Sequence, residues 1–314
     1  MNIKEENVIK NTKDLVEEIQ KAKPSFWECK FSKEKILEKY KFILTDNAKE
    51  RLNKLYTYIK KKIPVIIEGE TGASKSLSAE IICDIISKQS NISDRPPYIK
   101  YNLSAEVKIS DLMKKLTGDK TYLSGIKIIE GEFFRAFKEG IPLILDEINL
   151  ASPEVLQCIE DALDSQTINI EIPSIGHIEQ KMKDGFCLIA TQNPNKDNYA
   201  NKRQYLSQSF LSHFQILKFP SFEFDELKEI ANELFKSFNN NSSCSEKDKQ
   251  FITDLLDFHN KWVSEQEVKN DIVCFTIREI KACIQSYVEE QNTNGFKIVR
   301  VLYGSRYEKE KKKN

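Results

Sequence analysis

The stretch "EGETGASKS", residues 68–76, decides the fold of this chain. It follows "IPVIIE" (63–68), a short β-branched run typical of a strand, and it precedes a segment (77–86) with apolar residues at helical spacing. A strand, a glycine-containing loop ending in Lys-Ser and a helix form the context of a phosphate-binding loop, in which backbone N–H groups and the helix N-terminus surround the phosphates. The sequence therefore predicts a nucleotide-binding α/β fold.

Within this loop, Lys75 is expected to reach the β- and γ-phosphates, and the Ser76 hydroxyl is expected to bind magnesium. The residues expected to contact the nucleotide are Gly69, Glu70, Thr71, Gly72, Ala73, Ser74, Lys75, Ser76 and Leu77. Ser74 departs from the usual pattern, because it stands where the second glycine is expected and its Cβ restricts the backbone. Since Gly69 and Gly72 remain and serine is small, we expect altered affinity for the nucleotide rather than loss of binding.

Two carboxylates follow a second apolar run, "IPLILDE" (141–147). They lie at the carboxyl end of a predicted strand, where ligands bind in open α/β sheets. Asp146 suits a magnesium partner, and Glu147 suits a base that deprotonates the attacking water. An acidic pair at a strand end alone more often forms a solvated edge, but its combination with the phosphate loop indicates phosphoryl transfer.

A third element is "ATQNPN" (190–195), which follows a strand expected to lie between the two motif strands. The Asn193 amide can donate to the γ-phosphate or hold the lytic water. The alternative is that Asn193 only begins an Asn-Pro turn.

The strand candidates alternate with helical patterns, which predicts a parallel sheet covered by helices on both faces. They are residues 63–68, 98–104, 141–147, 186–192 and 214–220. A β-hairpin is expected at about 167–185, ahead of the fourth strand.

The chain divides by pattern into four expected parts. They are a charged helical extension (1–45), an α/β nucleotide-binding subdomain (46–220), an all-helical subdomain (221–305) and a basic tail (306–314). A helix over 44–62, capped by Thr45 or Asp46, opens the α/β part, and a polar loop (239–248) interrupts the helical part.

Composition excludes several classes of protein. Forty-eight basic residues balance forty-eight acidic ones, so no global field favours nucleic acid or anionic membranes. The longest apolar runs are far shorter than the ~20 residues of a membrane-spanning helix, and the N-terminus lacks a secretory pattern. The seven cysteines form no CxxC pair, which disfavours a cysteine zinc site or a disulfide framework. We therefore expect a soluble cytoplasmic or nuclear protein.

These motifs resemble those of AAA+ ATPases of the dynein-related, midasin and MoxR group, from about Leu44 to Tyr307. The similar stretches are "VIIEGETGASKS", "YNLSAEVKISDLM", "EGEFFRAFKEGIPLILDEINLASPEVL", "FCLIATQNP", "NKRQYLSQSFLSHF", "FTIREIKACI" and "VLYGSRY". The resemblance implies a Walker A loop at 69–76, Walker B at Asp146 and Glu147, sensor 1 at Asn193 and sensor 2 at Arg278 in a helical lid.

The same resemblance implies ATP and Mg²⁺ as cofactors, and ATP hydrolysis that drives remodelling of a macromolecular partner through motion of the lid. Members of the group act as rings of six chains or six linked units, so it implies a homo-oligomer or a place in a multi-unit assembly. The hairpin at 167–185 corresponds to an insertion that faces the substrate or a neighbouring unit.

His213 is the main departure from the group, whose members place an arginine finger just before the phenylalanine of "FLSHF". Such a finger changes rates by roughly 10³–10⁵, and histidine is shorter and only partly charged near neutral pH. Three alternatives are open at this position. Arg203 serves as the finger, the chain has no finger, or His213 only fills space beside Phe214. A nucleotide-binding scaffold with little turnover is therefore the alternative function; a DNA-handling module is disfavoured by the neutral charge.

Arg135 also matches the group, and is expected only to pair with a neighbouring carboxylate.

Overall fold

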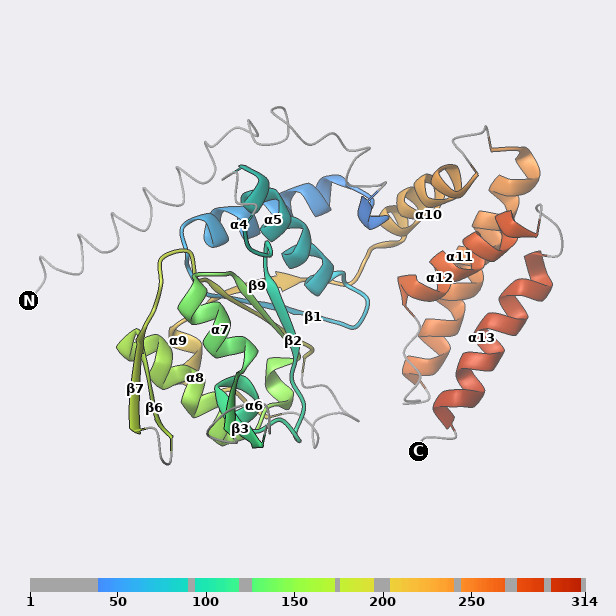
Figure 1. Cartoon of the computed structure of the whole chain (residues 1–314). Coiled ribbons are helices and arrows are strands. Elements are labelled where there is room, and N and C mark those ends of the chain that lie inside the picture. The colour runs from blue at the N-terminus through green and yellow to red at the C-terminus, as the bar shows by residue number, and fades with distance from the viewer. Residues whose placement is uncertain are drawn as a thin grey trace, which may run out of the picture.

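The computed structural model describes residues 39–89, 94–118, 126–172, 176–194, 204–239, 244–268, 276–290 and 295–311. Most of the predicted N-terminal extension therefore lies outside the described residues. Around the phosphate loop, the five predicted strands form one sheet in the order β2-β5-β8-β1-β9, with every neighbouring pair parallel (Figure 1). The strands are β1 (Val65–Gly69), β2 (Ile99–Asn102), β5 (Leu143–Asp146), β8 (Leu188–Gln192) and β9 (Gln215–Phe219). The predicted position of β8 between the two motif strands is confirmed.

Strand register brings the functional segments to one edge of the sheet. Glu68 of β1 lies opposite Gln192 of β8, and Leu145 of β5 lies opposite Ala190 of the same strand. Because all five strands run in the same direction, their carboxyl ends meet at this edge. The loops that follow β1, β5 and β8 are consequently neighbours in space.

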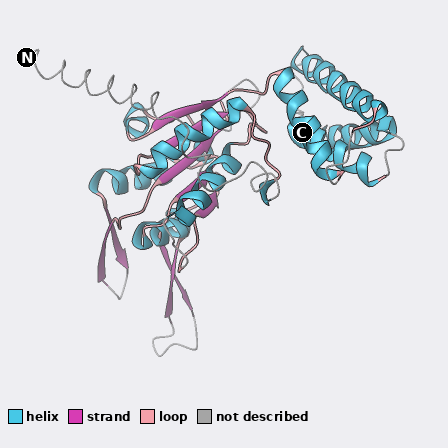
Figure 2. Cartoon of the chain, turned by 90° about the horizontal axis from the view of Figure 1, so that it is seen from above, coloured by secondary structure: helices cyan, strands magenta, loops and turns pink. Residues whose placement is uncertain are grey.

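Helices cover both faces of the sheet, as predicted (Figure 2). On one face lie α4 (Asp46–Lys60) and α5 (Lys75–Gln89), and on the other α7 (Glu132–Glu139) and α8 (Pro153–Ser165). Side chains of β1 alternate between the two faces of the sheet. Val65 and Ile67 belong to the core under α4 and α5, and Ile66 belongs to the core under α7 and α8. Thr45 caps α4 by accepting a hydrogen bond from the backbone N–H of Ala48, which selects it from the two predicted caps.

Two antiparallel hairpins project beyond the parallel sheet. The predicted one consists of β6 (Thr167–Ile172) and β7 (Gly176–Lys181) and follows α8 directly. A second hairpin, β3 (Lys114–Gly118) with β4 (Ile126–Glu130), follows the short helix α6 (Ile109–Leu112) and was not predicted. Its first strand reads "KKLTG", in which one apolar residue gives no alternating pattern.

The helical part contains α10 (Phe224–Phe238), α11 (Glu246–Val268), α12 (Ile277–Glu289) and α13 (Gly295–Lys311). These helices share a core of their own, in which Phe251 stacks on Tyr287. Two boundaries differ from the sequence prediction. Helix α11 begins inside the predicted polar loop, and α13 continues six residues into the segment predicted as a tail. The division into four parts remains a prediction.

The five cysteines that the structure describes are buried or partly buried. Among the described residues, Cys83, Cys187 and Cys283 are buried, Cys158 and Cys244 are partly buried, and all five are free thiols. Cys29 and Cys274 lie outside the described residues. None of the helices in the described ranges combines the length and the hydropathy that crossing a membrane requires.

Candidate functional site

The loop after β1 has the curled backbone of a phosphate cradle. Its peptide groups turn inward through a hydrogen bond from the Ala73 N–H to the Glu70 carbonyl, and α5 begins at Lys75. Gly72 has φ +90°, and Ser74 has φ +58°, a left-handed conformation that is rare for a residue with a Cβ. Ser74 therefore adopts the glycine-like backbone that the loop requires, at a conformational cost.

This cost gives a prediction for Ser74→Gly. Left-handed backbone costs an L-residue about 1–2 kcal/mol, while glycine gives back about 0.5–1 kcal/mol through the entropy of the unfolded chain. We expect the free energy of unfolding to rise by up to about 1 kcal/mol, measured by urea denaturation. The matched control is Ser264→Gly in helix α11, where glycine should destabilise by about 0.5 kcal/mol; equal signs for the two changes would contradict the assignment of strain to Ser74.

Lys75 is buried and links the phosphate loop to the segment that follows strand β8. Its ammonium donates to the carbonyls of Gly69 (2.8 Å) and Glu70 (2.9 Å) and to the Asn193 Oδ1 atom (2.7 Å). The Asn193 Nδ2 atom in turn donates to the Glu147 Oε1 atom at 3.2 Å. Lys75, Asn193 and Glu147 therefore form one hydrogen-bonded chain across three loops.

Asp146 is the centre of a second polar cluster. Its Oδ1 atom accepts hydrogen bonds from the hydroxyls of Ser76 and Thr191, and the Lys100 Nζ atom lies 3.3 Å from its Oδ2 atom. Burial works to raise the pKa of the Asp146 carboxyl, but the two hydroxyl donors and the Lys100 charge outweigh it and hold that pKa below its ordinary value. Asp146 is consequently an anion at neutral pH, held beside the Ser76 hydroxyl.

Glu147 stands at the mouth of the site. It is exposed, its backbone has φ +58°, and its N–H donates to the Thr191 hydroxyl at 3.2 Å. The left-handed turn ends β5 and starts a short 3-10 helix (Ile148–Leu150), so that Asp146 and Glu147 point to different partners. The two adjacent carboxylates are thereby separated into two environments.

The helical part closes over the phosphate loop. Thr276 caps α12, and a Cβ built on Gly72 would lie 2.6 Å from the Thr276 Cβ, so the loop and the start of α12 are in close contact. Arg278 lies on the first turn of α12, is exposed, and lines the same cavity as Lys75 and Glu147. The structure thus brings Arg278, the site residue predicted in the helical part, to the same cavity as the predicted phosphate loop.

A cavity of about 570 Å³ unites these residues, a size typical of small-molecule sites. Of the predicted residues, it is lined by Thr71, Gly72, Ala73, Ser74, Lys75, Ser76, Leu77, Asp146, Glu147, Asn193 and Arg278. Gly69 and Glu70 lie at the base of the loop, where their carbonyls hold Lys75. A Cβ on Gly69 would meet the Phe219 carbonyl at 2.3 Å, so this glycine is required for the close packing of β1 on β9.

The cavity has an apolar wall that the sequence did not reveal. Phe42 packs with the core of the sheet and Ile43 with the core of the helical part, and both line the cavity. Phe222, Ile230 and other apolar side chains complete this wall. It offers an apolar surface in the same cavity as the charged phosphate loop.

Positive charge in the cavity is incompletely balanced. Burial, together with the like charge of Lys41, lowers the pKa of Lys281 on α12. Both lysines line the cavity, as does Arg278. An anionic ligand would relieve this mutual repulsion.

Lys100 and Thr191 are site residues that sequence reasoning missed. Lys100 bridges Asp146 and Glu80, with its Nζ atom 2.8 Å from the Glu80 Oε1 atom. Thr191 contacts both Asp146 and Glu147. A signal for Thr191 was present, because it precedes Asn193 by two residues and alternation along a strand places both on one side.

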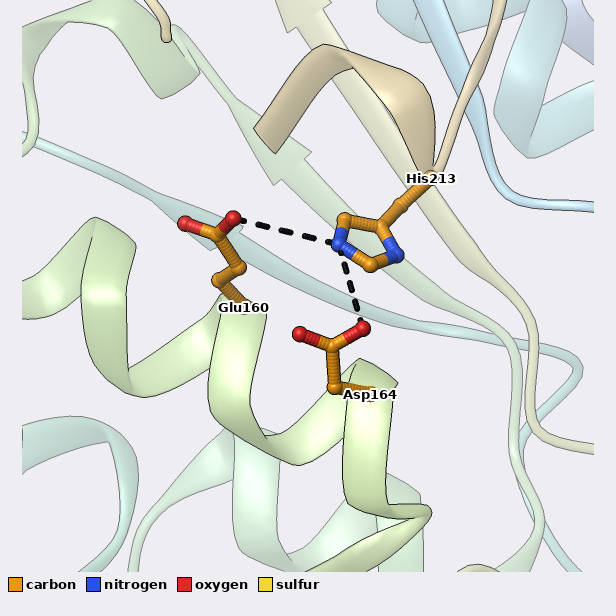
Figure 3. Close-up of side chains that lie close together, drawn as sticks. All are labelled: Glu160, Asp164 and His213. Atoms are coloured by element: carbon orange, nitrogen blue, oxygen red, sulfur yellow. Dashed lines mark ion pairs between the residues drawn. The ribbon is translucent and has the colours of Figure 1, made fainter. Parts of the chain in front are cut away.

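The remaining predicted residues have different surroundings. His213 does not only fill space beside Phe214: its Nε2 atom lies 3.5 Å from Asp164 and 3.9 Å from Glu160 (Figure 3). Arg203 lies outside the described residues. Arg135 pairs with Glu132 and Glu139 on its own helix, which confirms the predicted pairing with neighbouring carboxylates.

Comparisons with known proteins agree with this geometry. A family model described as AAA domain (dynein-related subfamily) matches residues 64–214. Midasin of Giardia intestinalis is 28% identical over 190 residues, which are 60% of this chain and 4% of that protein. Midasin of Dictyostelium discoideum is 27% identical over 207 residues, which are 65% of this chain and 3% of that protein. The chain therefore spans only a few per cent of the length of these relatives.

Among solved structures, NtrX from Brucella abortus in complex with ATP superposes with a TM-score of 0.51 at 14% identity. The likeness covers 81% of this chain and 53% of that chain. At this identity it supports the fold alone.

Proposed function

Because residues 64–214 are an AAA+ domain of the dynein-related group, we propose that this chain binds ATP with Mg²⁺ and hydrolyses it to drive remodelling of a macromolecular partner. The observation that carries the proposal is the hydrogen-bonded chain from Lys75 through Asn193 to Glu147, which lies beside the Ser76–Asp146 pair in one cavity. The proposed phosphate-binding group (Lys75), the proposed sensor (Asn193) and the proposed general base (Glu147) are thus joined in series by hydrogen bonds.

Ser76 and Asp146 fit a magnesium ion in the chemistry of their donors. A hydroxyl oxygen and a carboxylate oxygen are hard ligands of the kind that Mg²⁺ prefers, and here they already share a hydrogen bond. The lowered pKa of Asp146 keeps its carboxylate ionised at neutral pH. When bound, Mg²⁺ would neutralise charge on the phosphates.

Glu147 is proposed to take the proton of the attacking water. Its carboxylate is exposed at the cavity, and the Asn193 amide holds it by one oxygen. The other oxygen is then directed by this contact, which is what a general base requires. Lys75 places positive charge where the terminal phosphates would lie.

The apolar wall of the cavity is proposed to receive the nucleotide base, and Arg278 to contact the γ-phosphate. Contact between Gly72 and Thr276 couples the phosphate loop directly to the helix that carries Arg278. A change in the bound phosphates would therefore be transmitted to the helical part as a rotation of α12. The choice of ATP as ligand comes from the group resemblance.

The partner is proposed to be a macromolecule, and the acting form a ring of identical chains or of several AAA+ units. The hairpin β6–β7 projects from the sheet and is a surface suited to contact with a partner or neighbour (Figure 2). A soluble protein in the cytoplasm or nucleus is proposed. Nucleic acid and membranes are not proposed as partners.

The second candidate function is a nucleotide-binding scaffold with little turnover. The position of His213 favours it, because this side chain faces the carboxylates of Glu160 and Asp164 of its own chain. A histidine held in this way does not reach into a neighbouring site as an arginine finger would. Arg203 remains the alternative source of a finger.

ATP turnover with Mg²⁺ distinguishes the ATPase from the scaffold. It is measured per chain across a range of protein concentrations, with Glu147→Gln as the background. Turnover that rises with concentration above this background is expected, because a neighbour must complete the site. Absence of turnover above that of a protein-free solution at every concentration, with ATP binding intact, would overturn hydrolysis and leave the scaffold.

A further inference from the structure

We infer that Glu160, Asp164 and His213 form a binding site for a divalent transition-metal ion of the zinc class. Glu160 and Asp164 are four residues apart on α8 and therefore project from one face of that helix. His213 stands at the end of α9 (Gln208–Ser212), and its ring points between the two carboxylates (Figure 3). The cluster is separate from the nucleotide cavity, of which none of the three is a lining residue.

The donor atoms have the spacing that one ion requires. The His213 Nε2 atom lies 3.5 Å from the Asp164 Oδ1 atom and 3.9 Å from the Glu160 Oε1 atom, and all three donors lie within 4.8 Å of one another. Zinc bonds of about 2.0–2.2 Å to nitrogen and oxygen, in a tetrahedron, place the ligand atoms about 3.4 Å apart. Small rotations of the carboxylates suffice to close the site.

Charge provides a second argument, because the cluster has an excess of negative charge. Glu160 is nine-tenths buried, and within the described ranges its carboxylate pairs with no lysine or arginine. Its charge and that of Asp164 face one imidazole, which supplies at most a single positive charge. A buried carboxylate without a full counter-ion is costly, and a divalent cation would balance both carboxylates.

A neighbouring hydroxyl holds one donor of the site in place. The Ser209 hydroxyl donates to the Oε1 atom of Glu160 and so orients that carboxylate, the role that outer partners have in metal sites. The rings of Phe210 and Phe214, both buried, pack against each other on either side of His213 in the chain. Asp164, whose side chain is 64% exposed, leaves a path for the ion and for coordinating water.

One imidazole nitrogen and two carboxylate oxygens form a borderline ligand set that suits Zn²⁺, Co²⁺ or Mn²⁺ better than Mg²⁺. A bound ion would tie α9 to α8, and α8 leads directly into the hairpin β6–β7. The metal would therefore fix the base of the hairpin and the start of β9 together. Neither the sequence nor the cysteine pattern pointed to this site.

The test is a Zn²⁺ titration of the chelator-treated full chain by calorimetry, without nucleotide. Wild type is expected to bind one ion that His213→Ala, Glu160→Gln and Asp164→Asn each weaken by at least about 100-fold, more than the ~10–100-fold expected for the outer partner in Ser209→Ala. Co²⁺ should give the absorption bands of a low-symmetry site in wild type and lose them in His213→Ala.

The matched control is His177→Ala, since among the described residues the His177 Nδ1 atom pairs with one carboxylate, that of Glu171, at 3.5 Å. It should leave zinc affinity unchanged. Asp164→Asn changes an exposed side chain and should leave the fold intact. It therefore tests zinc binding even if substitution of the more buried Glu160 or His213 unfolds the chain. Absence of a zinc site in the folded wild type, or zinc affinity equal in wild type and Asp164→Asn, would overturn the inference.

Discussion

Glu147→Gln is expected to lower the ATP turnover number by about 10²- to 10⁴-fold, the contribution of a positioned general base. Glutamine has the size and shape of glutamate, and its side-chain oxygen can still accept the hydrogen bond from the Asn193 amide. Nucleotide affinity should therefore change little, because the phosphate loop and the Ser76–Asp146 pair are untouched. Single-turnover hydrolysis and equilibrium binding of ATP measure the two effects separately.

Glu154→Gln is the control for this prediction. Glu154 is an exposed glutamate on the first turn of α8, and it does not line the cavity. Turnover by this variant should match wild type. If Glu147→Gln hydrolysed ATP at the wild-type rate, Glu147 would not be the base, and the hydrogen-bonded chain from Lys75 would need another explanation.

Arg51→Met is expected to reduce the free energy of unfolding by about 3–5 kcal/mol, the effect of leaving one member of a buried ion pair without its partner. Arg51 on α4 and Glu226 on α10 are 2.6 Å apart, with side chains 12% and 7% exposed. Thr45 and Asn47 also donate to Glu226, and these two neutral donors would remain beside its charge. Urea denaturation followed by circular dichroism measures the change.

The exposed pair of Lys54 and Glu50 on the same helix provides the control, with side chains 45% and 68% exposed. Lys54→Met should cost less than about 1 kcal/mol. The double variant Arg51→Met/Glu226→Leu should recover most of the lost stability, because no buried charge is left. Equal costs for Arg51→Met and Lys54→Met would show that the buried pair contributes no more than a surface pair.

The parallel sheet could be predicted because each of its strands is a local pattern. A short β-branched run, a glycine loop and a spaced apolar helix are all visible within about 25 residues around Lys75, and similar local units recur along the chain. Parallel topology then brings the loops after β1, β5 and β8 together without further information. The predicted positions of Asp146, Glu147 and Asn193 relative to Lys75 follow from this rule.

The residues that were missed depend on contacts between distant segments. Arg51 meets Glu226, 175 residues away, and the apolar wall combines Phe42 with Ile230 across the two parts of the chain. Lys100 is one of many surface-type lysines until β2 is placed beside β5. No local pattern distinguishes such residues, since their roles arise only from tertiary packing.

The order of the strands has a consequence for how the chain folds. Val65 of β1 pairs with Ile189 of β8 and with Gln215 of β9, so the strand that starts the phosphate loop finds both neighbours more than a hundred residues later. Closing such long loops is slow because their entropy must be lost before the contacts form. During synthesis on the ribosome, β1 must wait until β9 has emerged, and its apolar edges are exposed meanwhile to chaperones and to aggregation.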